Sequence, residues 1–115
     1  MCHYRHHVHA DPLHLPGLTD ITAHVDFSAL CQAGLEAGLG VLGYTGQAQF
    51  LINCGLLDLV EGIAPGGADY YRAVAPVQKL LSPAEMGELF KVVALDRDLE
   101  MPLLGFKTGD RRMRL

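Results

Sequence analysis

The segment that follows Asp26 alternates apolar and polar positions with the period of a helix. Phe27, Leu30 and Leu35 fall on one side of it, and an aspartate directly before such a segment can accept the unpaired amides of a first helical turn. Gly38 supplies the left-handed residue that commonly follows the end of a helix. The pattern therefore predicts a helix that begins after Asp26 and ends before Gly38.

Two short apolar runs have the composition of buried strands. Residues 39–44 and residues 88–95 are rich in β-branched, aromatic and small side chains, which suit a strand that is covered on both faces. We expect these two runs to pair antiparallel and to form the centre of a small sheet. Residues 103–106 are a third apolar run and are predicted to add an edge segment.

Helices are also predicted on either side of a turn rich in glycine and proline at residues 62–67. Thr45 can cap the helix before this turn, and Gly55 interrupts it. Residues 69–81 return to helical spacing, with either a kink or the start of a new helix expected at Pro76, because proline lacks the backbone donor.

One further short helix is predicted after residue 82. Ser82 and Glu85 are spaced as the two members of a capping box, with Pro83 at the first helical position. Gly87 would end this helix.

The first 24 residues hold all six histidines of the chain. Residues 2–7 alternate as one strand would, and prolines disfavour regular pairing beyond Ala10, so a loop is predicted over residues 11–20. Imidazole is a common ligand of transition metals, but the histidine spacing matches no metal motif. We therefore favour polar histidines on an edge strand and a loop over a metal site.

Polar and apolar positions alternate over residues 20–26. The polar members are Asp20, Thr22, His24 and Asp26. A face with these groups could position a nucleophile or a proton acceptor, because carboxylate and imidazole are the usual general bases. Two capping aspartates beside a solvated turn explain the same pattern, and the residues alone favour this plainer interpretation. Gln47 follows a predicted strand-to-helix turn, where open α/β sheets place ligand contacts.

Composition narrows the class of protein. The chain has 115 residues, 50% of them hydrophobic and 19% charged, which is enough apolar material for one folded unit. A net charge of −4 lacks the basic surplus that nucleic-acid binding requires.

Residues 37–57 carry no charge, but five glycines interrupt them, so no membrane span is expected. Three cysteines without a Cys-x-x-Cys pair and no apolar signal segment favour a cytoplasmic location.

Several blocks of the sequence resemble a known family. They are Tyr4-Arg5-His6, the block from Asp20 to Phe27, the block from Gly43 to Gln47, and the block from Leu81 to Val92. Together they resemble the C-terminal part of the MidA-type S-adenosylmethionine-dependent methyltransferases, which include assembly factors of mitochondrial complex I. The sequence of these blocks is most similar to that of bacterial members. The resemblance implies an α/β fold, namely the C-terminal portion of a Rossmann-like class I methyltransferase, with a small sheet, flanking helices and residues 1–115 as a single unit.

The resemblance also implies a function. S-adenosylmethionine would be the cofactor, but this sequence lacks the glycine-rich loop that holds it in such folds, so its binding site is expected outside the chain. We therefore expect a fragment without an N-terminal half, inactive alone, that forms the substrate side of the enzyme. The methyl acceptor would be a protein side chain such as arginine.

The same resemblance points to six site residues, carried over position by position. We expect catalytic roles for Asp20, Thr22 and Asp26, and substrate binding by His6, His24 and Gln47. None of them is expected to bind the cofactor or a metal.

The alternative hypothesis is a non-enzymatic binding module, or a stranded fragment that associates with itself. Unpaired strand edges are then expected around Val41, Leu42 and Val92, where a second chain could add a strand. The state of association in solution separates these hypotheses from an independent monomeric module.

Overall fold

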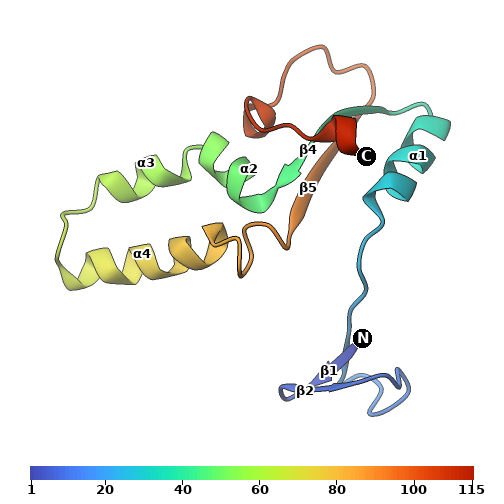
Figure 1. The fold of residues 1–115 in the computed structure, drawn as a ribbon, viewed down its shortest axis with the longest axis horizontal. Helices are drawn as coiled ribbons and strands as arrows, with labels where there is room; N and C mark the ends of the chain where they lie inside the picture. Colours follow the sequence, from blue (N-terminus) through green and yellow to red (C-terminus); the bar gives the residue numbers. More distant parts are fainter.

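Two antiparallel sheets, set apart from each other, organise the computed structural model, which describes residues 1–115 (Figure 1). The first contains β1 (Cys2–Tyr4), β2 (His7–His9) and β3 (Asp20–Ile21) in the order β2-β1-β3. The second pairs β4 (Gly40–Gly46) with β5 (Lys91–Asp96). An extended connection, residues 22–26, joins the first sheet to the rest of the chain, and no helix or strand of the rest contacts that sheet.

The prediction of a single N-terminal strand was wrong. β1 and β2 form a tight hairpin, with Tyr4 opposite His7. The turn is made by Arg5 and His6, which have φ angles of 44° and 67°. Left-handed residues at both central positions match the twist of a hairpin, but they are normally asparagine or glycine, so Arg5-His6 gave no signal of a turn. The predicted loop over residues 11–20 is confirmed up to Thr19.

The first predicted helix is confirmed. α1 spans Phe27–Glu36, and Asp26 caps it by accepting a hydrogen bond from the Ala29 amide at 2.9 Å. Gly38 has a φ angle of 79°, in the left-handed region as expected. Cys31 is buried, whereas Leu35 remains 58% exposed, so only part of the apolar face of α1 is covered.

The antiparallel pairing of the two apolar runs is also confirmed. Tyr44 lies opposite Val93, and an irregularity between Val41 and Gly43 shifts the register by one residue. Gly43 has to be a glycine, because a Cβ atom there would lie 2.3 Å from the Phe106 ring. β5 begins at Lys91 rather than at residue 88.

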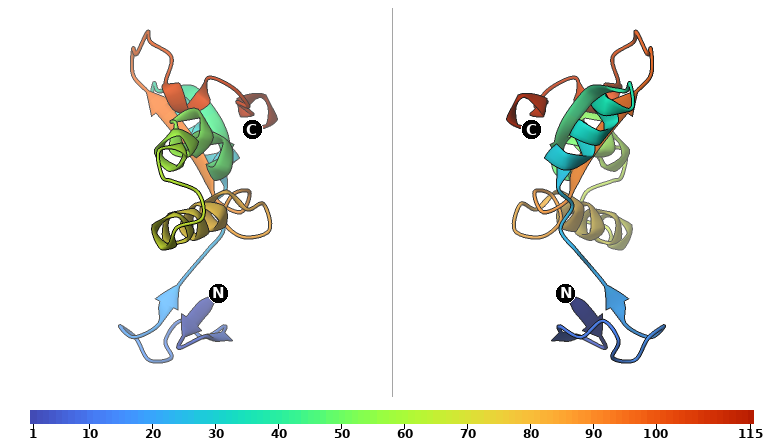
Figure 2. Two further views of the ribbon diagram at one scale, coloured as in Figure 1. Left: turned by 90° about the vertical axis from the view of Figure 1, so that its left-hand side faces the viewer. Right: turned by 90° about the vertical axis from the view of Figure 1, so that its right-hand side faces the viewer.

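Three helices follow β4: α2 (Gln47–Asn53), α3 (Leu56–Glu61) and α4 (Ala68–Leu81). The prediction that Thr45 caps α2 was wrong, because Thr45 is a fully buried residue of β4 whose hydroxyl donates to the Gly109 carbonyl at 2.9 Å. Gly55, at a φ angle of 90°, separates α2 from α3, and α4 continues through Pro76. Figures 1 and 2 show α3 and α4 projecting side by side from the second sheet.

Two further predictions from the sequence were wrong. Ser82 ends α4 instead of starting a helix, because its carbonyl accepts the amides of Glu85 and Gly87 and closes a series of turns. The apolar run at residues 103–106 is not a strand either: a short 3₁₀ helix, η1 (Leu104–Phe106), buries Phe106 against β4 and α2. A second one, η2 (Arg112–Arg114), lies beside β4.

The core is small for the length of the chain. Ten of 115 residues are buried, and the radius of gyration is 18.1 Å, against about 13 Å for a compact domain of this length. One expected open edge is closed: the Arg112 guanidinium donates to the carbonyls of Val41 and Leu42. The outer edge of β5, which includes Val92, has no strand beside it.

Candidate functional site

The structure brings two of the six predicted site residues together beside β1. Asp20 lies opposite His3 in β3, and the Thr22 hydroxyl donates to the Met1 carbonyl at 3.2 Å. Asp20 and Thr22 are two residues apart in the chain, at an exposed edge of the first sheet, and both are exposed. Their side chains can therefore be reached by a ligand from solvent.

The other four predicted residues lie at separate places. His6 is in the turn of the hairpin and His24 is exposed in the extended connection. Asp26 caps α1. Gln47, in α2, uses its side-chain amide to donate to the Leu80 carbonyl at 3.0 Å. The six residues do not form one cluster in this structure.

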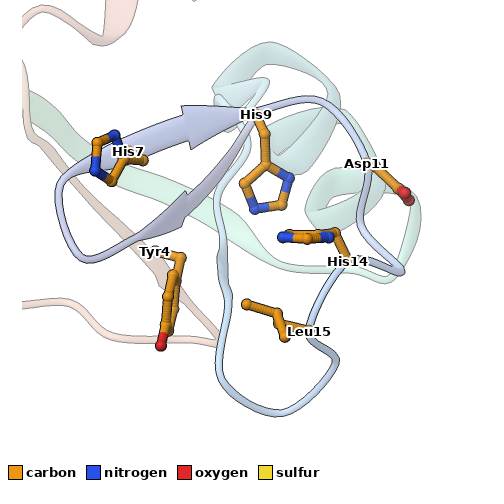
Figure 3. Close-up of a pocket in the computed structure, with 6 residues that line it drawn as sticks. All are labelled: Tyr4, His7, His9, Asp11, His14 and Leu15. Carbon is orange, nitrogen blue, oxygen red and sulfur yellow. The ribbon is translucent and has the colours of Figure 1, made fainter.

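A pocket of about 500 Å³ lies between the β1–β2 hairpin and the loop that follows it. Its lining residues are Tyr4, His7, His9, Asp11, His14 and Leu15 (Figure 3). The loop folds back so that the His14 ring meets the His9 ring edge-on, with centroids 5.1 Å apart. We name this group of six residues the histidine pocket.

Sequence reasoning identified these histidines but not their grouping. The pocket depends on the turn at Arg5 and His6 and on a left-handed Leu15, whose φ angle is 51°. Neither conformation has a sequence signal, since both are uncommon for residues other than glycine and asparagine. No three histidine, cysteine, aspartate or glutamate side chains lie close enough to hold a metal ion.

His9 is unusual within this pocket. Both of its ring nitrogens are shielded from solvent, and neither has a hydrogen-bond partner. Most buried polar side-chain atoms in proteins are hydrogen-bonded, because an unpaired one costs free energy. The ring therefore retains an unused capacity to bind a ligand.

A second polar cluster ties the C-terminal segment to the second sheet. The Asn53 side chain, 2% exposed, donates to the carbonyls of Gly105 and Thr108, both at 2.8 Å. Its side-chain oxygen accepts from the Thr108 hydroxyl at 2.7 Å. Both polar atoms of the Asn53 side chain are therefore satisfied within the chain, so this cluster holds the fold rather than a ligand.

The turn from β4 into α2 does not suit a nucleotide-type cofactor. Such cofactors are held by free amides at the first turn of a helix. Here the amides of Gln47 and Ala48 already donate to the carbonyls of Phe90 and Gly87. The residues present at this turn therefore do not fit S-adenosylmethionine.

An apolar groove of about 510 Å³ runs between α3 and α4. Leu57 and Val60 line it from α3, and Tyr70, Val74 and Val77 line it from α4.

No helix of the chain has the length and apolar character needed to cross a membrane.

Comparison with known proteins gives the family context. Residues 1–45 match a family model of S-adenosyl-L-methionine-dependent methyltransferases. The zebrafish (Danio rerio) mitochondrial protein arginine methyltransferase NDUFAF7 is 30% identical over 88% of this chain and 27% of its own length.

Two crystal structures of Burkholderia thailandensis proteins match the whole chain at 53% identity. One contains bound S-adenosyl-homocysteine and superposes with a TM-score of 0.91 over 30% of its chain. The other, a native structure, superposes with a TM-score of 0.92 over 31% of its chain. The present chain thus spans less than a third of the length of each of these relatives.

Proposed function

Because the chain belongs to the MidA-type S-adenosylmethionine-dependent methyltransferases, we propose that it forms the substrate side of such an enzyme, with a protein side chain such as arginine as the methyl acceptor. S-adenosylmethionine is the cofactor of this family. The fold is a portion of the Rossmann-like methyltransferase fold, with small sheets and flanking helices.

One observation carries this proposal. The whole chain aligns at 53% identity and a TM-score of 0.91 with a structure that contains S-adenosyl-homocysteine, the product that the cofactor leaves after giving up its methyl group. The acceptor class is supported by the zebrafish relative, which is named a protein arginine methyltransferase.

In this proposal the methyl donor is held by residues outside the chain, since the β4–α2 turn offers no free amides. Asp20 and Asp26 supply carboxylates that hold the acceptor or take its proton, and Thr22 orients it. His6, His24 and Gln47 bind the substrate, with Gln47 using its side-chain oxygen because its amide group donates to Leu80.

Because the core is only partly covered, we infer that the chain binds a partner. Leu59 is 74% exposed and Tyr71 66%, and apolar surface of this kind favours association. We propose that the partner is either the cofactor-binding part of the methyltransferase fold or a second copy of the chain. We further propose that the protein is located in the cytoplasm. The same surface supports the alternative function, a non-enzymatic binding module.

A chimera tests the proposed function. The 30% of the Burkholderia protein that matches this chain is replaced by residues 1–115, and the chimera is given radiolabelled S-adenosylmethionine with arginine-containing proteins. We expect bound S-adenosyl-homocysteine and label on arginine. The 115-residue chain alone is the control and is expected to be inactive. A chimera that binds S-adenosyl-homocysteine yet labels no protein would contradict the assigned acceptor class.

A further inference from the structure

The histidine pocket has walls that favour a flat ligand. Figure 3 shows the side chains of Tyr4, His9, His14 and Leu15 around a common space, with His7 and Asp11 farther out. Three of these four side chains are rings, and Leu15 closes the floor. A volume of about 500 Å³ falls within the usual range of small-ligand pockets, about 300–1,000 Å³.

Ring faces of this kind attract cations. The π-face of a tyrosine carries negative potential, and guanidinium groups stack on it more often than ammonium groups do. The chain itself shows this preference, since the Arg5 guanidinium lies 5.5 Å from the centre of the Tyr4 ring. Arg5 is exposed in the hairpin turn, so it does not seal the pocket.

The charge of the lining also favours a cation. The titratable groups facing the pocket are Tyr4, His7, His9, Asp11 and His14. Asp11 is the one carboxylate among them. One Asp11 oxygen accepts the Leu13 amide at 2.9 Å, which leaves the other oxygen for a ligand.

No hydrogen-bond donor reaches the His9 ring in this structure, and such a ligand can supply one. Both ring nitrogens of His9 are without a partner. A guanidinium carries five N–H groups and no acceptor, so it can donate to the one ring nitrogen of His9 that accepts. His14, which covers His9, is an exposed side chain that can turn aside. The left-handed backbone of Leu15 is costly for a residue other than glycine, and it places this side chain in the pocket wall.

We propose that the histidine pocket binds the guanidinium group of the methyl acceptor, stacked on the Tyr4 ring, with Asp11 as the one carboxylate of the lining. This inference rests on the proposed function, because it assigns a place for the acceptor of the same reaction. None of the six residues of the pocket was among the predicted site residues.

Binding to the 115-residue chain without cofactor tests the pocket. The probes are methylguanidine and an arginine-containing peptide, measured by calorimetry. We expect saturable binding of both. Inorganic phosphate is the opposing probe and is expected not to bind. Binding of phosphate without binding of methylguanidine would overturn the proposal.

Variants locate the binding. Tyr4→Ala and Asp11→Asn are each expected to weaken methylguanidine binding at least fivefold, whereas Tyr4→Phe keeps the ring and the affinity. Met113→Ala, at an exposed side chain of η2, is the control and should bind as the parent does. Equal affinity of all these variants would place the site elsewhere.

The outcome is independent of the chimera. If the chimera methylates arginine but Tyr4→Ala and Asp11→Asn leave both peptide affinity and KM unchanged, the pocket assignment fails and the proposed function stands. If the pocket binds methylguanidine but the chimera labels no arginine, the assigned reaction fails and the guanidinium site remains.

Discussion

Arg111 and Glu88 form a two-point ion pair, with Nη1 to Oε2 at 2.9 Å and Nη2 to Oε1 at 2.8 Å. Lys91 also contacts the Glu88 carboxylate, at 3.0 Å. The hydrogen bonds from Arg111, followed by those from Lys91, lower the pKa of Glu88 from 4.5 to about 2. In return, the Glu88 carboxylate raises the pKa of Arg111 above its usual value. This pair fastens the C-terminal segment to the residues that precede β5.

The lowered pKa of Glu88 predicts a loss of stability in acid. A carboxyl group whose pKa falls on folding stabilises the protein above its unfolded pKa, and this stabilisation disappears as the pH falls through the folded pKa. We therefore expect Glu88→Gln to lower the stability by about 1 kcal/mol at pH 6, a figure reduced for solvent screening because Glu88 is 40% exposed. The difference should shrink as the pH falls from 4.5 toward 2 in thermal unfolding. Glu61→Gln, at an exposed helix end, is the control, and a constant difference over this range would refute the pairing.

Substitution of Gly43 is predicted to lower the stability of the core by a steric clash. Gly43→Ala would place a Cβ atom 2.3 Å from the Phe106 ring, and overpacking of this kind costs about 1–3 kcal/mol. Urea unfolding measures the loss. Gly62→Ala is the matched control, because nothing lies within 4 Å of its added Cβ atom. Equal stability of the two variants would show that Phe106 does not pack on β4.

Asp26 allows a structural role to be separated from a catalytic one. Asp26→Ala removes the cap of α1 and should cost about 1 kcal/mol, whereas Asp26→Asn keeps a capping side chain and should cost little. In the chimera, Asp26→Asn is expected to lower kcat at least tenfold if the carboxylate assists the reaction. Full activity of Asp26→Asn would leave Asp26 with its capping role alone.

The 115-residue chain alone is predicted not to bind S-adenosylmethionine. It lacks a glycine-rich turn with free amides, and the first amides of α2 are already used. Calorimetry with the purified chain checks this. Saturable binding at micromolar concentration would mean that a cofactor site lies within these residues.

The chain is also predicted to self-associate when no partner is supplied. Apolar side chains of α1, α3 and α4 are exposed, including Leu35, Leu59 and Tyr71, and the outer edge of β5 has no neighbour. Sedimentation at micromolar concentration should show dimers or larger species. A single monomeric species with a cooperative melting transition would instead favour the independent module.

Local sequence signals predicted the elements that depend on local chemistry. Asp26 and Gly38 marked the two ends of α1 because capping and left-handed glycine act within a few residues. The apolar runs that became β4 and β5 were visible, and so was their antiparallel pairing. The family resemblance, carried by blocks along most of the chain, was confirmed by comparison.

Other predictions were wrong because tertiary contacts outweigh the local preference of the residues. Thr45 had the composition of a cap, but its hydroxyl meets Gly109, 64 residues away, inside the sheet. Ser82 and Glu85 had the spacing of a capping box, but the Ser82 carbonyl closes a turn that leads into β5.

The sequence by itself determined where α1 begins, which two runs form the second sheet and which family the chain resembles. Only the tertiary structure decided that the chain reverses at Arg5 and His6 and that Leu15 takes a left-handed conformation. Those two conformations bring His9 and His14 to 5.1 Å of each other and create the histidine pocket. The physical reason is that neither conformation is favoured by its own residue, so contacts between the hairpin and the loop have to select both.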